Sequence, residues 1–181
     1  MSATTAVPTG TWAADKGHSR VGFAVKHLGI ATVRGHFAEF EGSFEVGDDL
    51  ASSKITASVQ TASVDTAEAA RDEHLRSAEF FNVEEHPEMT FESTSISADG
   101  SDITITGDLT IAGVTNEITL SAEVLGTETD PWGNERVGLE ISGSISRGDF
   151  GMKFNQALGS GNVLVGDKVK IDLDISAVKQ G

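Results

Sequence analysis

The sequence predicts an all-β fold: an antiparallel sheet of about eight strands with one helical insertion near residues 65–81. Apolar and polar residues alternate with a period of two along most of the chain, as half-buried strands require. Short turn signals rich in Gly, Asp and Asn separate the alternating segments, and only one segment is rich in helix formers. An antiparallel sheet with one apolar face buries that face by closing into a barrel or folding into a sandwich, and the alternation permits both.

The alternation is cleanest in the second half of the chain. Between Ile103 and Ile111 every second residue is apolar or Gly, and the residues between them are Thr or Asp. Together with the less regular first half, the pattern predicts strands at 18–28, 33–46, 55–64, 88–97, 103–111, 117–124, 137–150 and 169–175. The strands at 33–46 and 137–150 are long and punctuated by Gly, which indicates bends or bulges where the sheet curls.

The helical insertion runs from Asp65 to Phe81, with Asp65 or Thr66 as the expected N-cap. Its apolar positions Ala67, Ala70 and Leu75 recur at helical spacing, and Phe80 and Phe81 follow them. This spacing predicts that the helix packs against the sheet and covers one end of it.

The length of 181 residues suits a single compact domain, expected at 11–181 after a flexible N-terminal segment at 1–10. Hydrophobic residues make up 38% and Pro is scarce at 3, so the chain is neither disordered nor membrane-spanning. The absence of Cys excludes disulfides, thiol catalysis and thiolate metal sites.

The chain is acidic, with 13 Lys+Arg against 28 Asp+Glu and a formal net charge of -15. Such a field repels phosphate backbones and anionic lipid surfaces, so nucleic acid is not an expected partner. The expected exterior is soluble and solvated. Met1 to Thr11 lack the basic and apolar regions of a secretory signal, which predicts a cytoplasmic protein.

Whether the interior is filled or open depends on small residues in the inward phase, the alternate strand positions whose side chains point into the sheet's apolar side. Gly107, Ala122, Gly126 and Gly143 leave volume that neighbouring aliphatic side chains either fill or leave open. An eight-stranded barrel is just wide enough for side chains or one small ligand. The sequence favours a lined tunnel over a solid core without excluding the core.

The candidate chemical residues do not form a recognisable catalytic or metal-binding pattern. The five His residues, at 18, 27, 36, 74 and 86, have no metal-ligand spacing, and no Ser lies in a Gly-x-Ser-x-Gly elbow, so neither a metal nor a cofactor is expected. An enzyme would use His74, or His18, with Asp72 as an acid/base pair. The favoured interpretation is that Asp72, His74, Arg76 and Arg147 fix the helix to the sheet through hydrogen bonds and ion pairs.

Several motifs in order resemble one known family. They are Asp15–Ser19 leading into Val21–Phe23, Val33–Phe37, Arg71–Arg76 followed by Phe80-Phe81, Pro87–Ser93, Gly107–Ile111 with Gly113–Thr115, Asp130–Gly133, and Arg147–Gly151. The sequence is similar, over residues 11 to 177, to the YceI-like family of bacterial polyisoprenoid-binding proteins. The resemblance implies a lipocalin-like extended β-barrel that holds an elongated lipid, such as a polyprenyl chain or an isoprenoid quinone, with no cofactor. Many members of that family are periplasmic and begin with a signal peptide.

The leading hypothesis is therefore a non-catalytic carrier of a long apolar lipid, without stable membrane insertion and with a homodimer left open. Its expected ligand-binding residues are Phe23, Val25, Phe37, Phe80, Phe81, Phe91, Ile105, Leu109, Leu120, Ile141, Ile145, Phe150 and Met152, of which Phe80, Phe81, Phe150 and Met152 would close or gate the tunnel. The first alternative is an enzyme acting on an isoprenoid or lipid substrate through His74 and Asp72. The second is a structural module with a filled barrel and a protein partner on its acidic face.

Overall fold

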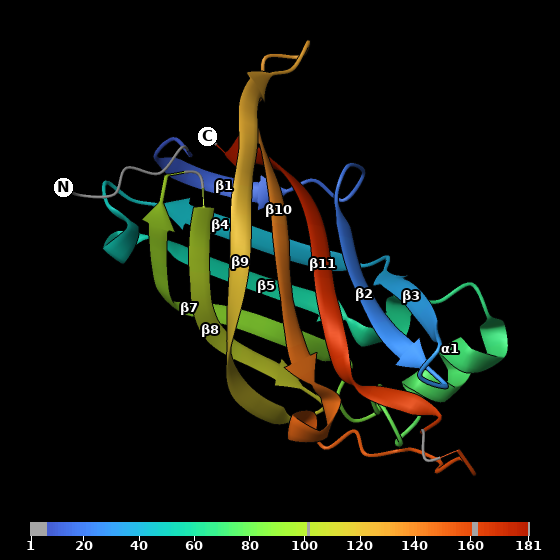
Figure 1. Cartoon of the computed structure of the whole chain (residues 1–181). Helices are drawn as coiled ribbons and strands as arrows, with labels where there is room; N and C mark the ends of the chain where they lie inside the picture. Colours follow the sequence, from blue (N-terminus) through green and yellow to red (C-terminus); the bar gives the residue numbers. More distant parts are fainter. Residues whose placement is uncertain (1–6, 101, 161–162, 181) are drawn as a thin grey trace.

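The computed structural model describes residues 7–100, 102–160 and 163–180, and most of the expected flexible segment at 1–10 lies outside these residues. Eight long antiparallel strands close into a barrel, with one α-helix at one end (Figure 1). The predicted all-β class, the barrel and the approximate strand number are confirmed. Three of the eight strands are interrupted, so the sheet contains eleven strand segments.

The elements follow the chain in a simple order. The strands are β1 (Gly10–Ala14), β2 (Arg20–His27), β3 (Ala31–Phe37), β4 (Phe40–Val46), β5 (Lys54–Gln60), β6 (Val64–Asp65), β7 (Glu88–Asp99), β8 (Asp102–Ile111), β9 (Val114–Thr129), β10 (Glu135–Ser146) and β11 (Val165–Gln180). The helix is α1 (Ala69–Arg76), and the 3-10 turns are η1 (Leu50–Ser52), η2 (Thr61–Ser63) and η3 (Arg147–Phe150).

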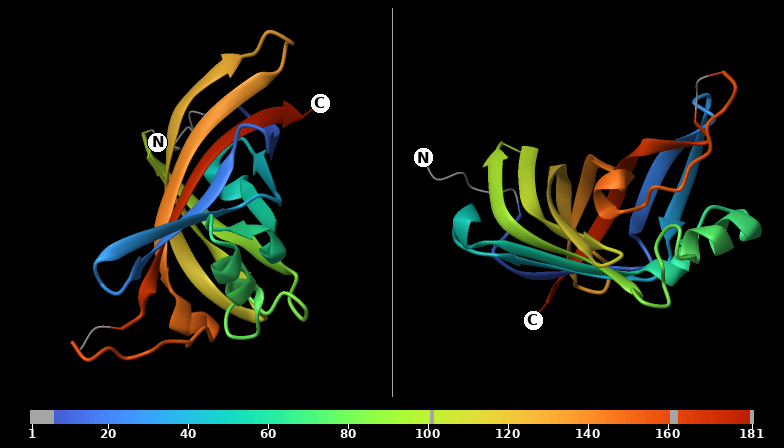
Figure 2. Two further views of the ribbon diagram at one scale, coloured as in Figure 1. Left: turned by 90° about the vertical axis from the view of Figure 1, so that its right-hand side faces the viewer. Right: turned by 90° about the horizontal axis from the view of Figure 1, so that it is seen from below.

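The ring of strands is closed at one end of the barrel, and β1 is the strand that closes it. There β1 pairs with β4 on one side and with residues 177–180 of β11 on the other. Towards the other end β11 pairs instead with β2, and β2, β3 and β6 continue the sheet to a free edge at β6. The view from below in Figure 2 shows β2 and β3 standing apart from β7 and β8, with α1 on the side of β2 and β3.

The interruptions between β3 and β4 and between β5 and β6 lie side by side. The Gln60 N–H donates to the Glu39 carbonyl at 2.9 Å, and the Ala38 N–H donates to the Ser63 carbonyl at 3.2 Å. The inward phase changes at this level: on β3 it includes Phe37, whereas on β4 it includes Phe40. The predicted strands 33–46 and 55–64 therefore each break into two segments. The segment β1 was not predicted, because its five residues are too few to show a period.

The helix is shorter than the predicted 65–81. Asp65 belongs to β6 and pairs with His36, and Ala67 has a positive φ of 65°, so neither position can begin the helix. The N-cap is Glu68 rather than Asp65 or Thr66. At the other end the Ser77 N–H and hydroxyl both donate to the His74 carbonyl and end the helix.

The end of the barrel closed by β1 contains a solid core. Trp12 is 0% exposed there, and its indole N–H donates to the Pro8 carbonyl at 3.0 Å. Inward residues of β8, β9, β10 and β11 pack around it, including Ile103, Ala122, Val137 and Ala177. The main interior volume lies towards the end that carries α1, and a space of only about 50 Å³ remains beside Phe44 and Ile103.

Candidate functional site

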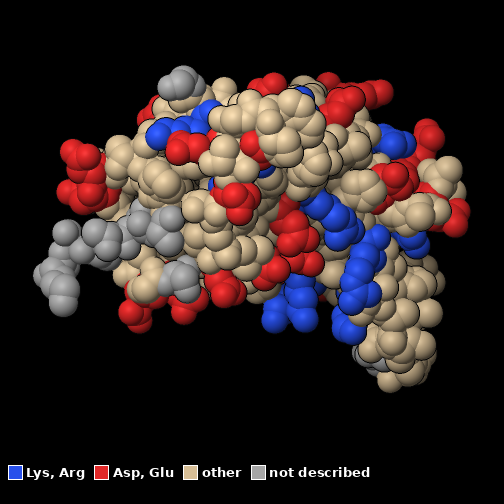
Figure 3. Space-filling model, turned by 90° about the horizontal axis from the view of Figure 1, so that it is seen from above, with Lys and Arg blue, Asp and Glu red and all other residues tan. Residues whose placement is uncertain are grey.

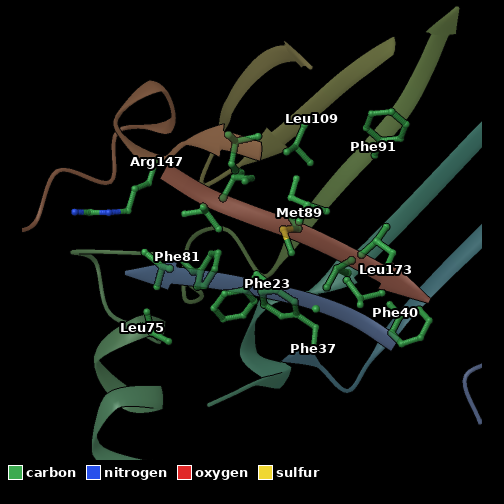
Figure 4. A pocket seen from close by; sticks show the side chains of 18 of the residues that line it. Phe23, Phe37, Phe40, Leu75, Phe81, Met89, Phe91, Leu109, Arg147 and Leu173 are labelled. Carbon is green, nitrogen blue, oxygen red and sulfur yellow. The ribbon is translucent and has the colours of Figure 1, made fainter. Parts of the chain in front are cut away.

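A cavity of about 530 Å³ occupies the barrel interior between this core and α1 (Figure 4). Its volume falls within the range of about 300–1,000 Å³ that ligand pockets usually have. Its walls are overwhelmingly apolar and come from every strand of the sheet except β6, together with α1 and the segments that follow α1 and η3. The interior is therefore a lined tunnel rather than a completely filled core.

Twelve of the thirteen residues expected from the sequence to contact a ligand line this cavity. They are Phe23, Val25, Phe37, Phe80, Phe81, Phe91, Ile105, Leu109, Leu120, Ile141, Ile145 and Met152. Phe150 does not: it is 2% exposed and packs with Leu109, Ile111 and Met152 in the cluster beside the cavity. It follows β10 within η3, where the period-2 phase of the strand no longer determines its direction.

Other lining residues were missed by the sequence reasoning. They include Phe40, Val59, Met89 and Leu173. Phe40 and Val59 lie next to the strand breaks, and Leu173 follows the inward phase of β11 that Ile171 and Ile175 already indicate. The same alternation, followed through the phase change on β4, could have found them.

Three small residues on neighbouring strands line one part of the cavity. Ala14 on β1, Gly42 on β4 and Ala57 on β5 all line it, and Gly42 pairs directly with Ala57. A Cβ atom built on Gly42 would lie 3.5 Å from the Ala14 Cβ, an ordinary contact.

The small residues singled out from the sequence have a different role. A Cβ on Gly107 would lie 2.5 Å from both the Glu92 carbonyl oxygen and the Phe91 Cζ, and a Cβ on Gly143 would lie 2.6 Å from the Leu120 Cδ2. Gly126 is exposed on the part of β9 beyond the barrel core. Of the two outcomes left open for these glycines, the structure shows the filled one at Gly107 and Gly143, because neighbouring atoms approach them closely, whereas Gly126 lies outside the core.

The mouth of the cavity lies at the α1 end, where three of its five exposed lining residues stand. Lys26 on β2 and Ala70 and Arg71 on α1 are exposed, and His27 and His74 are half-buried. Four of the eight polar lining residues belong to this group, whereas the opposite end is lined by residues such as Phe44 and Ile141.

Aromatic rings line both sides of the mouth. Phe37 lies between Phe23 and Phe81, with ring centroids 5.5 Å apart in both pairs. The His74 imidazole lies 5.0 Å from the Phe80 ring and 4.7 Å from the Phe154 ring, edge to face with each. Rigid rings of this kind offer contact area to an apolar ligand at low entropic cost.

Arg147 lies beside the mouth and is 5% exposed. Its guanidinium donates to three main-chain carbonyls, those of Gly166 at 2.8 Å, Met152 at 2.7 Å and Val165 at 3.2 Å. Burial lowers the pKa of Arg147, and the charge of Asp167 opposes this shift. The side chain thus fixes the segment that follows η3 to the start of β11.

The structure does not bring His74 and Asp72 together as an acid/base pair. Asp72 is buried and accepts hydrogen bonds from the Thr66 N–H at 2.8 Å and hydroxyl at 2.5 Å, whereas His74 lies 3.2 Å from a Glu79 carboxylate oxygen. Positions two apart on a helix do not face each other. The expected dyad is therefore absent from its predicted place, and His18 pairs instead with Asp15 at 2.8 Å in the turn after β1.

The four residues expected to fix the helix do so in part. Arg76 donates to the Ala62 carbonyl at 3.0 Å and the Val64 carbonyl at 3.4 Å, which ties α1 to η2 and to β6. Asp72 fixes the approach to the helix through Thr66. Arg147 was expected to join this set, but its hydrogen bonds go to the segments around residues 152 and 165 and not to α1.

Two further features were searched for in the described residues. Within 7–100, 102–160 and 163–180, no group of three or more His, Cys, Asp or Glu side chains could hold a metal ion. Over the same ranges, no helix has the length and apolar character needed to cross a membrane.

Comparison with known proteins places these observations in a family. The model of the YceI-like domain matches residues 12–177. Protein YceI of Escherichia coli O17:K52:H18 is 45% identical over 137 residues, covering 75% of this chain and 72% of that protein. The crystal structure of a YceI protein from Campylobacter jejuni is 31% identical with a TM-score of 0.73, covering 92% of this chain and 96% of that one. A polyisoprenoid-binding domain from Saccharophagus degradans shares the fold at 14% identity, with a TM-score of 0.71 over 93% of this chain and 98% of that domain.

Proposed function

The chain belongs to the YceI-like family, and from this membership and the cavity we propose that it is a non-catalytic carrier of one long isoprenoid-type lipid. The cargo class is a polyprenyl chain or an isoprenoid quinone. The observation that carries the proposal is the apolar cavity of about 530 Å³ inside a closed barrel. The name of the structurally similar domain from Saccharophagus degradans, a polyisoprenoid-binding domain, supports the same class.

The volume and the lining suit a lipid tail. At about 30 Å³ for each water-sized group, the cavity accommodates on the order of 18 such groups. Burial contributes about 0.8 kcal/mol per CH₂, so a tail that fills the cavity gains roughly 14 kcal/mol before the costs of ordering and association. Micromolar binding requires about 8 kcal/mol, so the apolar contacts alone suffice.

The lining also orients the cargo. Because the deep end of the cavity is lined by apolar residues and polar side chains stand at the mouth, the tail enters first and the polar headgroup stays near Arg71 and His74. Apolar burial distinguishes weakly between tails of similar girth, so the headgroup and the tail length decide the preference. No nucleophile or acid/base pair is required for such binding.

Native mass spectrometry of the purified protein, combined with organic extraction, tests this function. We expect a co-purifying lipid in stoichiometric amount, or uptake of an added polyprenyl quinone by the delipidated protein. A homogeneous, folded preparation that neither carries a lipid nor takes up the quinone would contradict the proposal.

A further inference from the structure

The sequence around the β2–β3 hairpin departs from the acidic character of the chain. Although the protein has 28 Asp and Glu residues, none occurs between Asp15 and Glu39, a stretch that includes Lys26 and Arg34. The structure places this stretch beside the mouth of the cavity, since Phe23, Val25 and His27 of β2 line it. The surface at the mouth therefore differs in charge from the rest of the molecule.

Four basic side chains share the outer face of β11, β2 and β3. In the sheet register Lys170 on β11 lies opposite Ala24, and Ala24 lies opposite Arg34 on β3. Lys168 and Lys26 stand on the same face nearer the hairpin tip. We call Lys26, Arg34, Lys168 and Lys170 the basic stripe. Figure 3 shows Lys and Arg side chains gathered beside a lobe without charged side chains.

The basic stripe is not neutralised within the protein. All four side chains are exposed, and in the part of the chain that the structure describes none of them forms an ion pair with Asp or Glu. The Lys26 ammonium donates to the Thr32 hydroxyl at 2.8 Å. The nearby Asp167 carboxylate accepts hydrogen bonds from the Ser146 hydroxyl and the Gly148 N–H instead. The four positive charges are therefore available to an external anion.

Exposed apolar side chains lie next to the basic stripe. Ile30, at the tip of the β2–β3 hairpin, is 81% exposed, and Val163 is 42% exposed. The Leu28 N–H donates to the Leu164 carbonyl at 3.0 Å, so the hairpin tip and the start of the segment leading into β11 are joined. A protruding apolar tip flanked by cations matches the boundary between the acyl chains and the headgroups of an anionic bilayer.

We propose that the β2–β3 hairpin and the basic stripe dock the mouth of the cavity onto an anionic lipid bilayer. The inference rests on the proposed function, because a carrier of an insoluble lipid has to exchange it with a membrane. Ile30 enters the interface while Lys26, Arg34, Lys168 and Lys170 contact the lipid headgroups. The net charge of -15 opposes association at long range, so docking is weak, reversible and sensitive to salt.

Sedimentation with vesicles tests the docking directly. Vesicles of phosphatidylcholine are compared with vesicles of equal parts phosphatidylcholine and phosphatidylglycerol, at low and at high salt. The protein should bind only the mixed vesicles and only at low salt. Each basic residue near an anionic surface contributes roughly fivefold in affinity, so Lys168→Gln with Lys170→Gln should weaken binding about 30-fold.

Matched controls separate the site from the overall charge. Lys16→Gln with Lys54→Gln removes the same charge from positions outside the stripe, and Leu125→Ser removes an apolar side chain that is 59% exposed on β9. Both should bind like the unmodified protein, whereas Ile30→Ser should bind more weakly. Equal losses in the stripe variant and the charge control, or wild-type binding by the stripe variant, would overturn the proposal.

Uptake of a polyprenyl quinone separates docking from cargo binding. From detergent solution, without a bilayer, the stripe variant should take up as much quinone as the wild type, because the cavity lining is unchanged. From donor mixed vesicles its uptake should be slower. If neither the wild type nor any variant takes up quinone from detergent, the proposed lipid cargo is contradicted, whereas the result of the vesicle sedimentation is unaffected. The two proposals therefore fail in different measurements.

Discussion

Filling the cavity beside Ala14 and Ala57 is the sharpest test of cargo binding. Gly42 lines the cavity where Ala14 and Ala57 also stand, and a Cβ there would make only an ordinary contact at 3.5 Å. Gly42→Leu adds about four CH₂-sized groups to the interior, which displace the same amount of lipid tail. At about 0.8 kcal/mol per group the loss is about 3 kcal/mol, or roughly 200-fold in affinity.

Displacement of a fluorescent polyene from the delipidated protein by a polyprenyl quinone measures this loss. The variant should unfold at the same temperature as the wild type or higher, since the new side chain buries apolar surface that the empty barrel leaves uncovered. Gly17→Leu is the matched control, because Gly17 is exposed in the turn before β2 and a Cβ there meets only a side-chain oxygen of Asp15 at 3.5 Å. A folded Gly42→Leu protein with wild-type affinity would refute the placement of the tail.

Three further predictions concern pH, stability and chemistry. Hydrogen bonds from Arg136 hold the pKa of Asp15 and Asp130 at about 2, below the ordinary 3.8. The stability that these two ionised carboxylates add to the folded protein is therefore complete above about pH 4 and is lost towards pH 2. Arg136→Gln should therefore lower the unfolding temperature at neutral pH and much less near pH 2, and an equal decrease at both would contradict this. Arg147→Met should lower the free energy of urea unfolding by about 3 kcal/mol, because three carbonyls each lose the hydrogen bond from the guanidinium and, among the described residues, only that of Val165 keeps another side-chain donor, Asn155; unchanged stability would contradict that role. Lipid extracted from His74→Ala and from the wild type should be chemically identical by mass spectrometry, and a product found only with the wild type would indicate catalysis.

The part of the fold that the sequence predicts well is the part where the inward phase never changes. From Ile103 to Ile111 every odd-numbered position is buried, as the alternation requires, because β8 is paired along its whole length with β7 and β9. The same regularity explains why most of the predicted ligand contacts line the cavity. On a barrel strand the direction of a side chain follows from its parity alone, that is, from whether the residue holds an odd or an even position along the strand.

The sequence predicts less where the parity shifts. Phe37 and Phe40 both point inward although they are three residues apart, so a single period-2 template cannot fit 33–46. Gly42 was missed for this reason. Gly107 shows the opposite limit: its parity indicates an inward position, but only the coordinates show that the Phe91 ring and the Glu92 carbonyl already occupy the space above it. Local pattern determines direction, whereas free volume depends on residues distant in sequence.

The same parity shifts give the barrel one closed and one open end. Because β1 and β2 each pair with a different part of β11, the sheet continues from β11 in two directions: β1 leads to β4 and closes the ring, and β2 leads to β3 and β6 and does not. The gap between β6 and β7 is bridged by Thr61, whose N–H and hydroxyl both donate to the Pro87 carbonyl at 3.0 Å. The core around Trp12 therefore stabilises the closed ring independently of the mouth. Changes to the β2–β3 hairpin should alter exchange with a membrane while leaving the ring folded, which is the separation that the docking variants require.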